Sequence, residues 1–183
     1  KDPVPKGRRG DLSRHPPSSL PDFASHCGSV EAAKLEVAAA SEPLMETVAL
    51  VACVKSKRDE PTRAADLYDS PWFRKARAYA KSRSDRWRIL SAKHGAVAPD
   101  AVIEPYNESL HDFSAAERRK WAEDVLRSLQ AILSPEDKVV ILAGHRYREY
   151  LIQPLRERIR TVTVPMEGLG IGKQLQFLNE RLS

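Results

Sequence analysis

Cysteine and long apolar runs are scarce in this sequence of 183 residues, and each shortage excludes a class of protein. The two cysteines, Cys27 and Cys53, lie in very different contexts, so no disulfide framework is expected and a reduced, cytoplasmic setting is predicted. The longest apolar run, Val48–Val54, is far shorter than the roughly 20 residues that cross a bilayer, so no membrane span is expected. The composition, 42% hydrophobic and 30% charged, is otherwise typical of globular proteins.

Motifs that bind metals or cofactors are also missing. Cys53, His94, His111 and His145 show no paired spacing such as C-x-x-C or H-x-x-x-H, so no zinc site is expected. The basic loop that follows Val54 lacks the glycine array of a phosphate-binding P-loop. No metal and no cofactor is predicted for this protein.

Residues 1–44 contain few large apolar side chains and six of the thirteen prolines. Such a segment cannot bury enough surface to offset its loss of conformational entropy, so it is predicted to be a mostly disordered leader, with one helical pattern over Val30–Ala40. It lacks the apolar centre of a secretory signal. Met45 directly precedes the first expected strand, so we expect one domain over residues 45–183.

The net charge of +5 is unevenly distributed. Residues 1–44 are neutral, whereas residues 55–93 hold twelve basic and five acidic residues, a net charge of +7. The rest of the chain has a net charge of −2. A concentrated excess of this kind indicates an anionic partner such as DNA, although a solvated basic helix face would give the same count.

Four short apolar runs predict strands that are buried on both faces: Val48–Val54, Arg88–Ser91, Lys138–Ala143 and Thr161–Val164. Helical patterns follow them: two have start signals, at Ser70-Pro71 and at the capping box Ser114-Ala-Ala-Glu117. A third pattern repeats every four residues from Tyr147 to Ile159, and Gly172 is expected to open the last helix. Pro154 is expected to kink or split the third helix. Strands that alternate with helices predict a three-layer α/β/α domain around a mainly parallel four-stranded sheet.

Ligands bind such sheets beyond the carboxyl ends of the strands, so the loops that follow each strand carry the candidate site. The loop after the first strand supplies Lys55, Ser56, Lys57 and Arg58 as phosphate-binding groups and Asp59 as a carboxylate. The loop after the second strand supplies Ser91, Lys93, His94, Gly95, Glu104, Tyr106 and Asn107. Gly95 is expected to adopt a positive φ, and Tyr106 with Asn107 to stack on a base and read its edge.

The later strand ends add two further groups of candidates. Gly144, His145, Arg146 and Tyr147 follow the third strand, where Gly144 is expected to allow a sharp turn into a helix N-terminus suited to an anion. Glu167 and Gly168 follow the fourth strand, in a loop with three alternating glycines. Trp72 is the tryptophan best placed for base stacking, because it lies in the basic segment, whereas Cys53 is expected to be a small buried apolar residue.

The run Ile89-Leu-Ser-Ala-Lys-His-Gly95, with Pro99, Ile103, Pro105 and Tyr106, resembles peroxide-stress proteins of the YaaA type. Cys53-x-Lys-x-Lys and Ala65-Asp-Leu-Tyr-x-Ser-x-x-Phe73 are similar to an uncharacterised bacterial and phage domain family related to them. Over residues 47–182, the resemblance implies a uracil-DNA-glycosylase-like fold. For some members it implies DNA glycosylase activity against phage DNA with modified cytosines. The Asp-Pro-Tyr and His-Pro-Ser motifs of uracil-DNA glycosylases are absent.

The leading hypothesis is therefore a DNA glycosylase that flips out a modified base, such as a hydroxymethylated or glucosylated cytosine, in defence against phage. His94 or His145 would stabilise charge on the departing base, and Asp59 or Glu104 would steady the sugar cation or position water. Asp66, Asp69 and Asp100 are rival carboxylates. The alternatives are a non-catalytic DNA-binding stress protein of the YaaA type and an enzyme that acts on a nucleotide or nucleoside.

Overall fold

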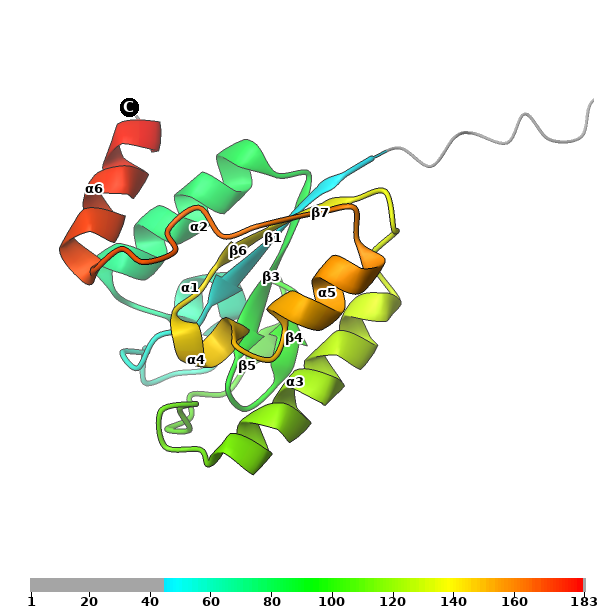
Figure 1. The fold of residues 1–183 in the computed structure, drawn as a ribbon. Helices are drawn as coiled ribbons and strands as arrows, with labels where there is room; N and C mark the ends of the chain where they lie inside the picture. The colour runs from blue at the N-terminus through cyan, green and yellow to red at the C-terminus, as the bar shows by residue number, and fades with distance from the viewer. Residues whose placement is uncertain (1–44, 183) are drawn as a thin grey trace, which may run out of the picture. The chain divides into compact units, whose positions relative to one another are not determined.

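The computed structural model describes residues 45–182, which fold around a five-stranded sheet (Figure 1). Its strands are β1 (Thr47–Ala52), β3 (Arg86–Ser91), β4 (Gly95–Val97), β6 (Lys138–Leu142) and β7 (Thr161–Thr163). They lie in the order β4-β3-β1-β6-β7, and only β4 pairs antiparallel to its neighbour. The mainly parallel α/β fold and its four parallel strands are thereby confirmed, while β4 is a fifth strand that the sequence did not reveal. The leader and its helical pattern lie outside the described residues.

The central strand β1 is buried from both sides. Val48, Leu50 and Val51 have almost no exposed surface, and β1 pairs in parallel with both β3 and β6. A strand in this position has no polar face, which explains why Val48–Ala52 shows no alternation between apolar and polar residues. The apolar run therefore marks the middle of the sheet.

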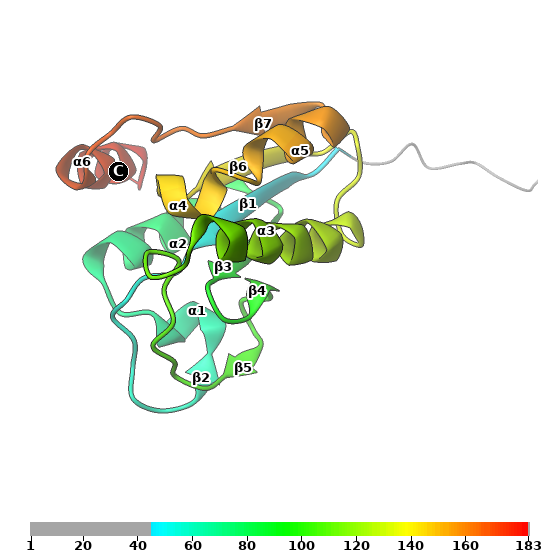
Figure 2. The same cartoon turned by 60° about the horizontal axis from the view of Figure 1, so that its bottom comes forward.

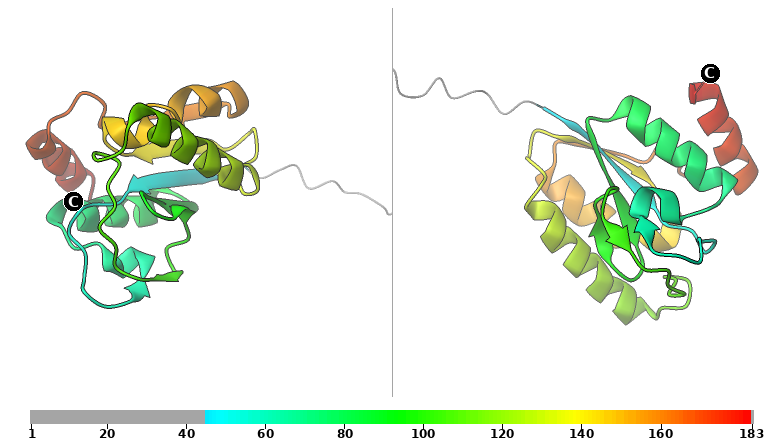
Figure 3. Two further views of the ribbon diagram at one scale, coloured as in Figure 1. Left: turned by 90° about the horizontal axis from the view of Figure 1, so that it is seen from below. Right: turned by 180° about the vertical axis from the view of Figure 1, so that it is seen from behind.

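Helices cover both faces of the sheet. Figures 2 and 3 show α2 (Pro71–Arg83) on one side of β1, and α3 (Ala115–Gln130) with α5 (Ile152–Arg158) on the other. The last helix, α6 (Ile171–Leu182), packs against α2, and the Trp72 Nε1 donates a hydrogen bond to the Gln174 side chain at 2.8 Å. Trp72 is only 9% exposed, so it joins two helices and presents no open ring for base stacking.

Two of the expected helix starts, at Ser70 and at Ser114, are confirmed by their capping contacts. The Ser70 hydroxyl accepts a hydrogen bond from the Phe73 N–H at 3.0 Å, with Pro71 as the first helical residue. The capping box of α3 joins Ser114 and Glu117 through contacts of 2.7 and 3.3 Å. These contacts form within one helical turn, so local sequence is sufficient to specify them.

The third helical pattern divides into two helices, but Pro154 does not mark the division. A short α4 (His145–Arg148) ends before α5 begins at Ile152. Pro154 lies in the first turn of α5, where a backbone N–H has no partner within the helix, so proline is tolerated there.

The long loop after β3 contains more regular structure than the sequence indicated. Besides β4, it includes β5 (Val102–Ile103), which pairs antiparallel with β2 (Thr62–Arg63) in a second, two-stranded sheet. The four-residue helix α1 (Ala64–Leu67) follows β2 directly. Strands of two or three residues are too short to show a periodic pattern, which is why the segment reads as an irregular polar loop.

Two of the candidate glycines adopt positive φ angles. Gly95 has φ of 67°, as expected, and Gly168 has φ of 74°. Gly144 has φ of −66° and is the N-cap of α4, so the chain enters a helix at this glycine in extended backbone and without a positive φ.

Replacing Gly95 by Ala is expected to lower the free energy of unfolding by about 1–2 kcal/mol, because an L side chain is disfavoured at positive φ. Sterics would add little, since the new Cβ would lie 3.6 Å from Val125, an ordinary van der Waals contact. Gly95→Asn is the matched control, because Asn tolerates the left-handed region better than Ala. Urea denaturation measures both variants, and an Ala variant as stable as wild type would show that backbone strain at Gly95 is negligible.

Candidate active site

The order of the strands places a switch point between β1 and β6. The chain passes from β1 to β3 on one side and then crosses to β6 on the other. Parallel α/β sheets bind ligands at such a point, beyond the carboxyl ends of the strands. A cavity of about 370 Å³ lies there, lined by Cys53, Val54, Lys55, Ser109, His111, Asp112 and Tyr147.

The inner wall of this cavity is formed by Cys53 and Tyr147, both of which are buried. The Cys53 Sγ lies 3.1 Å from the Tyr147 hydroxyl oxygen, a contact that joins the end of β1 to α4. Burial, with the neighbouring Cys53, raises the pKa of Tyr147 above its ordinary value. Tyr147 therefore keeps its proton at neutral pH and presents a neutral hydroxyl.

A tight turn over residues 109–112 supplies the charged rim. The Asp112 N–H donates to the Ser109 carbonyl at 3.0 Å, and the His111 N–H donates to the Ser109 hydroxyl at 3.3 Å. The turn thus places an imidazole and a carboxylate at the cavity that Lys55 also lines. The His111 imidazole, the Asp112 carboxylate and the Lys55 side chain therefore share a single site.

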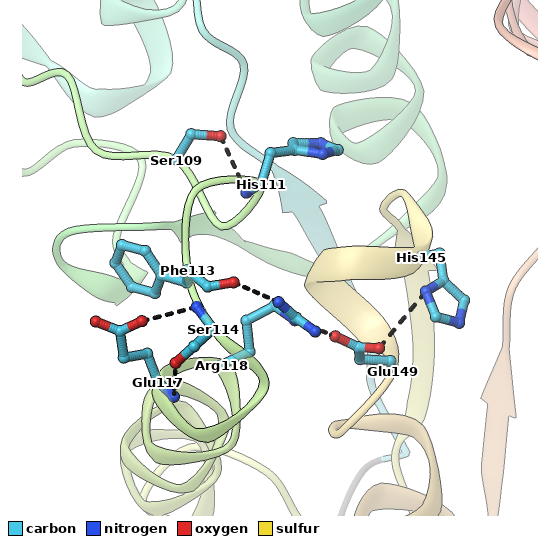
Figure 4. A network of polar contacts seen from close by, with 8 residues as sticks. All are labelled: Ser109, His111, Phe113, Ser114, Glu117, Arg118, His145 and Glu149. Carbon is cyan, nitrogen blue, oxygen red and sulfur yellow. Dashed lines mark hydrogen bonds and ion pairs between the residues drawn. The ribbon is translucent and has the colours of Figure 1, made fainter.

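Arg118 fixes this turn to the rest of the protein (Figure 4). Its guanidinium donates to the Phe113 carbonyl and pairs with the Glu149 carboxylate, which follows α4. The Arg118 and Glu149 side chains are only 8% and 15% exposed, so the pair is largely withdrawn from water. Glu149 also lies 3.6 Å from the His145 Nδ1. The pair consequently positions the loop of His111 and Asp112 against α4.

A chain of hydroxyl groups lies behind the end of β3. The Tyr106 hydroxyl is 2.7 Å from both the Tyr68 hydroxyl and the Ser91 hydroxyl, and Ser91 also accepts from the His94 N–H at 3.0 Å. Burial raises the pKa of Tyr68 to about 12 and that of Tyr106 further above its usual range. Ser91 is fully buried and Tyr106 is 6% exposed, so both anchor the loop in this structure and leave no open face for a base.

Basic side chains surround the Tyr106 ring. The Lys57 Nζ lies 4.3 Å from the ring centroid, and the His94 ring meets Tyr106 edge-on at 5.3 Å. Lys93 lies 3.9 Å from the Glu108 carboxylate. Desolvation lowers the pKa of Lys57, and desolvation with the adjacent Lys93 lowers the pKa of His94. His94 is therefore mainly neutral at pH 7.

The remaining candidates do not line the cavity. They are exposed: Ser56, Arg58 and Asp59 follow β1, Glu104 and Asn107 follow β5, Gly144, His145 and Arg146 form the start of α4, and Glu167 and Gly168 follow β7. Glu167 pairs with Arg148. The structure thus brings Lys55 and Tyr147 to the cavity wall, and Lys57, Ser91, Lys93, His94 and Tyr106 into a neighbouring cluster, while Gly95 opens β4.

Sequence reasoning missed Ser109, His111 and Asp112. His111 was considered only as a metal ligand, and among residues 45–182 no group of His, Cys, Asp or Glu is arranged to hold a metal ion. One signal was available in the sequence. The three residues lie just before the capping box of α3, in the loop that joins β3 to α3 at the carboxyl edge of the sheet, where functional residues are common.

The basic segment does not gather at the cavity. Arg86 is aligned with Val48 at the start of the sheet and pairs with Glu46 there. Arg74 and Arg77 pair with carboxylates of their own segment. The positive charge of residues 55–93 is therefore divided between the two edges of the sheet, because the chain between two parallel strands must return to the opposite edge.

The fold and the cavity define a doubly wound α/β protein with a cavity at the switch point of its sheet, lined in part by polar side chains. None of the helices within residues 45–182 combines the length and apolar character that a membrane crossing requires. Residues 48–180 match the family described as "Family of unknown function (DUF6884)", and the chain belongs to that family. It is similar to the uncharacterized protein YfjM of Bacillus subtilis (strain 168), with 31% identity over 144 residues, which cover 74% of this chain and 94% of the relative. No solved structure matches the chain.

Proposed function

We propose that this protein is a DNA glycosylase that accepts a flipped base and hydrolyses its N-glycosidic bond. The observation that carries the proposal is the cavity at the β1/β6 switch point, where Asp112, His111 and Lys55 meet. Its volume of about 370 Å³ falls within the range of small-molecule sites and has room for a nucleobase. The related uracil-DNA-glycosylase-like fold is part of the proposal, since it also places its site at the carboxyl edge of a parallel sheet.

The cavity residues suit the charge changes of this reaction. As the glycosidic bond breaks, the sugar gains positive charge and the base gains negative charge. The Asp112 carboxylate would stabilise the sugar cation and orient the attacking water, and His111 would donate a hydrogen bond or a proton to the departing base. Asp59 or Glu104, with His94 or His145, are the alternatives from the sequence, and Asp112 and His111 are preferred because they line the cavity.

The surrounding loops suit a DNA backbone. Lys55, Ser56 and Arg58 are exposed in the loop that follows β1, and Arg146 is exposed in α4 after β6, on the same edge of the sheet as the cavity. Phosphate contacts from these groups would offset the few kcal/mol needed to unstack a base. Asn107 is also exposed and offers both a donor and an acceptor for reading the base edge.

The substrate we propose is DNA with modified cytosine, in the context of defence against phage. This part rests on the resemblance to the anti-phage members of the YaaA-related group. A nucleotide- or nucleoside-processing enzyme is the second candidate, and the volume of about 370 Å³ together with Lys55 as a group for one phosphate favours it.

Alkaline cleavage of abasic sites tests the proposal directly. Duplexes carrying cytosine, uracil, hydroxymethylcytosine or glucosylated hydroxymethylcytosine at one position would be incubated with the protein and then heated in alkali. We expect strand breaks at the modified position and none at unmodified cytosine. Breaks on no substrate, with binding that falls steeply as salt rises, would instead indicate a non-catalytic DNA-binding protein. Release of base from free nucleosides alone would establish the second candidate.

A further inference from the structure

Tyr147 places a buried hydroxyl group in the wall of the cavity. Tyr147 is 7% exposed and lines the cavity beside Cys53, which is 6% exposed. The charged lining residues Lys55, His111 and Asp112 are exposed, so they belong to the mouth of the cavity. A buried hydroxyl group requires a hydrogen-bond partner, so the partner that Tyr147 has now indicates what it could bind.

The Tyr147 proton has a weak acceptor in the Cys53 sulfur. The Sγ lies 3.1 Å from the Tyr147 hydroxyl oxygen, and a thiol is weak both as a donor and as an acceptor. The Leu110 backbone and the Ser109 side chain favour the ionised form of Tyr147, as groups do that donate to a phenolic oxygen, but burial outweighs them and raises its pKa. A carbonyl oxygen that entered the cavity would therefore be a better acceptor for this proton than the sulfur is.

Trp121 holds the Tyr147 ring in a fixed orientation. The two rings meet edge-on, with their centroids 5.8 Å apart and their planes at 89°. The Trp121 Nε1 in turn donates to the carbonyl of Ser91, the last residue of β3, at 2.9 Å. A donor that is already oriented in this way needs no reorganisation when a partner gains negative charge.

We propose that the Tyr147 hydroxyl donates a hydrogen bond to the O2 carbonyl oxygen of a flipped pyrimidine base and so selects pyrimidines over purines. The inference rests on the proposed function, which places the base in this cavity. O2 lies next to the glycosidic nitrogen N1 in each pyrimidine base of DNA, whereas purines have no carbonyl group beside N9. As the bond to N1 breaks, negative charge spreads onto O2, and the hydrogen bond from Tyr147 strengthens. Asp112 would act on the sugar, and Tyr147 on the base.

A cycle of one protein change and one atom change tests the inference. Two duplexes carry the base that is excised fastest in the alkaline assay, or hydroxymethylcytosine if none is excised. One has oxygen at position 2 of that base and the other has sulfur, a weaker acceptor. We expect the oxygen-to-sulfur ratio of single-turnover excision rates to be at least about tenfold larger in wild type than in Tyr147→Phe. Comparison of the two ratios cancels what sulfur does to the base itself.

Tyr79→Phe is the matched control, and its ratio should equal that of wild type. Tyr79 packs against Phe177 and lines a different cavity at Thr47, where β1 begins. The same duplexes with fluorine at C2′ of the target sugar measure binding without excision, because fluorine destabilises the sugar cation. Wild type should bind the oxygen duplex at least about threefold more tightly than the sulfur duplex, and Tyr147→Phe should bind both alike.

The outcomes separate this inference from the proposed function. Excision with equal ratios in wild type and Tyr147→Phe, or equally fast excision of a purine, would overturn the role of Tyr147 alone. Oxygen-dependent binding through Tyr147 without excision of any base would overturn the glycosylase proposal alone. Neither excision nor oxygen-dependent binding would overturn both. Since wild type itself must prefer the oxygen duplex, the inference stays falsifiable even if Tyr147→Phe folds poorly.

Discussion

Asp112→Asn is expected to slow base excision by at least about 100-fold while leaving the fold intact. The asparagine keeps the size of the side chain but cannot carry the negative charge that would stabilise the sugar cation and orient water, a contribution of about 10²- to 10⁴-fold for a positioned acid or base. The Asp112 side chain is exposed, so the free energy of unfolding should change by no more than about 0.5 kcal/mol. Single-turnover rates of strand breakage after alkali measure the effect.

The matched control is Asp124→Asn, which removes an exposed carboxylate on the outer surface of α3. Its excision rate should equal that of wild type. Asp59→Asn and Glu104→Gln test the carboxylates that the sequence favoured. If either of them abolishes excision while Asp112→Asn keeps the wild-type rate, the catalytic carboxylate lies outside the cavity and the assignment of Asp112 is wrong.

Arg118→Met is expected to lower the free energy of unfolding by about 3–5 kcal/mol, the usual cost of removing one partner from a buried ion pair. The loss leaves the Glu149 carboxylate, which is 15% exposed, without its guanidinium, and leaves the Phe113 carbonyl without that donor. Because the same residue holds the turn of His111 and Asp112, excision should weaken as well. Urea denaturation measures the change in stability.

Two comparisons isolate the ion pair. Arg127→Met removes an arginine of the same helix that is 73% exposed, and surface pairs contribute only about 0–1 kcal/mol, so this control should stay close to wild type. The double variant Arg118→Met/Glu149→Leu should recover much of the lost stability, because no unpaired charge remains buried. An Arg118→Met variant as stable as Arg127→Met would show that the pair does not stabilise the fold.

The sequence was most informative where structure depends on neighbours along the chain. The capping contacts of Ser70 and Ser114 form within one helical turn, and the unbroken apolar run Val48–Ala52 reports burial on both faces. The positive φ of Gly95 was likewise visible from the residue type. The short strands β2, β4 and β5 were not visible, because two or three residues carry no period and pair only with distant partners.

The sequence predicted which loops form the candidate site, but it did not predict which side chains of those loops line the cavity. The sequence correctly directed attention to the segments after each strand, because parallel strands end at one edge of the sheet. It could not show that Tyr106 and Ser91 turn inward to share hydroxyl contacts, or that the turn at Ser109 brings His111 and Asp112 to the cavity. These orientations depend on contacts between residues that lie far apart in the chain.

By itself, then, the sequence determined the α/β class, the four parallel strands, the helix starts and the absence of a long apolar run. The tertiary structure decided which polar groups line the cavity, which ones form buried hydrogen bonds that hold the loops in place, and where the positive charge lies. The segment of residues 55–93 reads as one basic block, yet its members divide between Lys55 at the cavity and Arg86 at the opposite edge. The physical reason is that a crossover between parallel strands traverses the whole sheet, so neighbours in sequence separate in space.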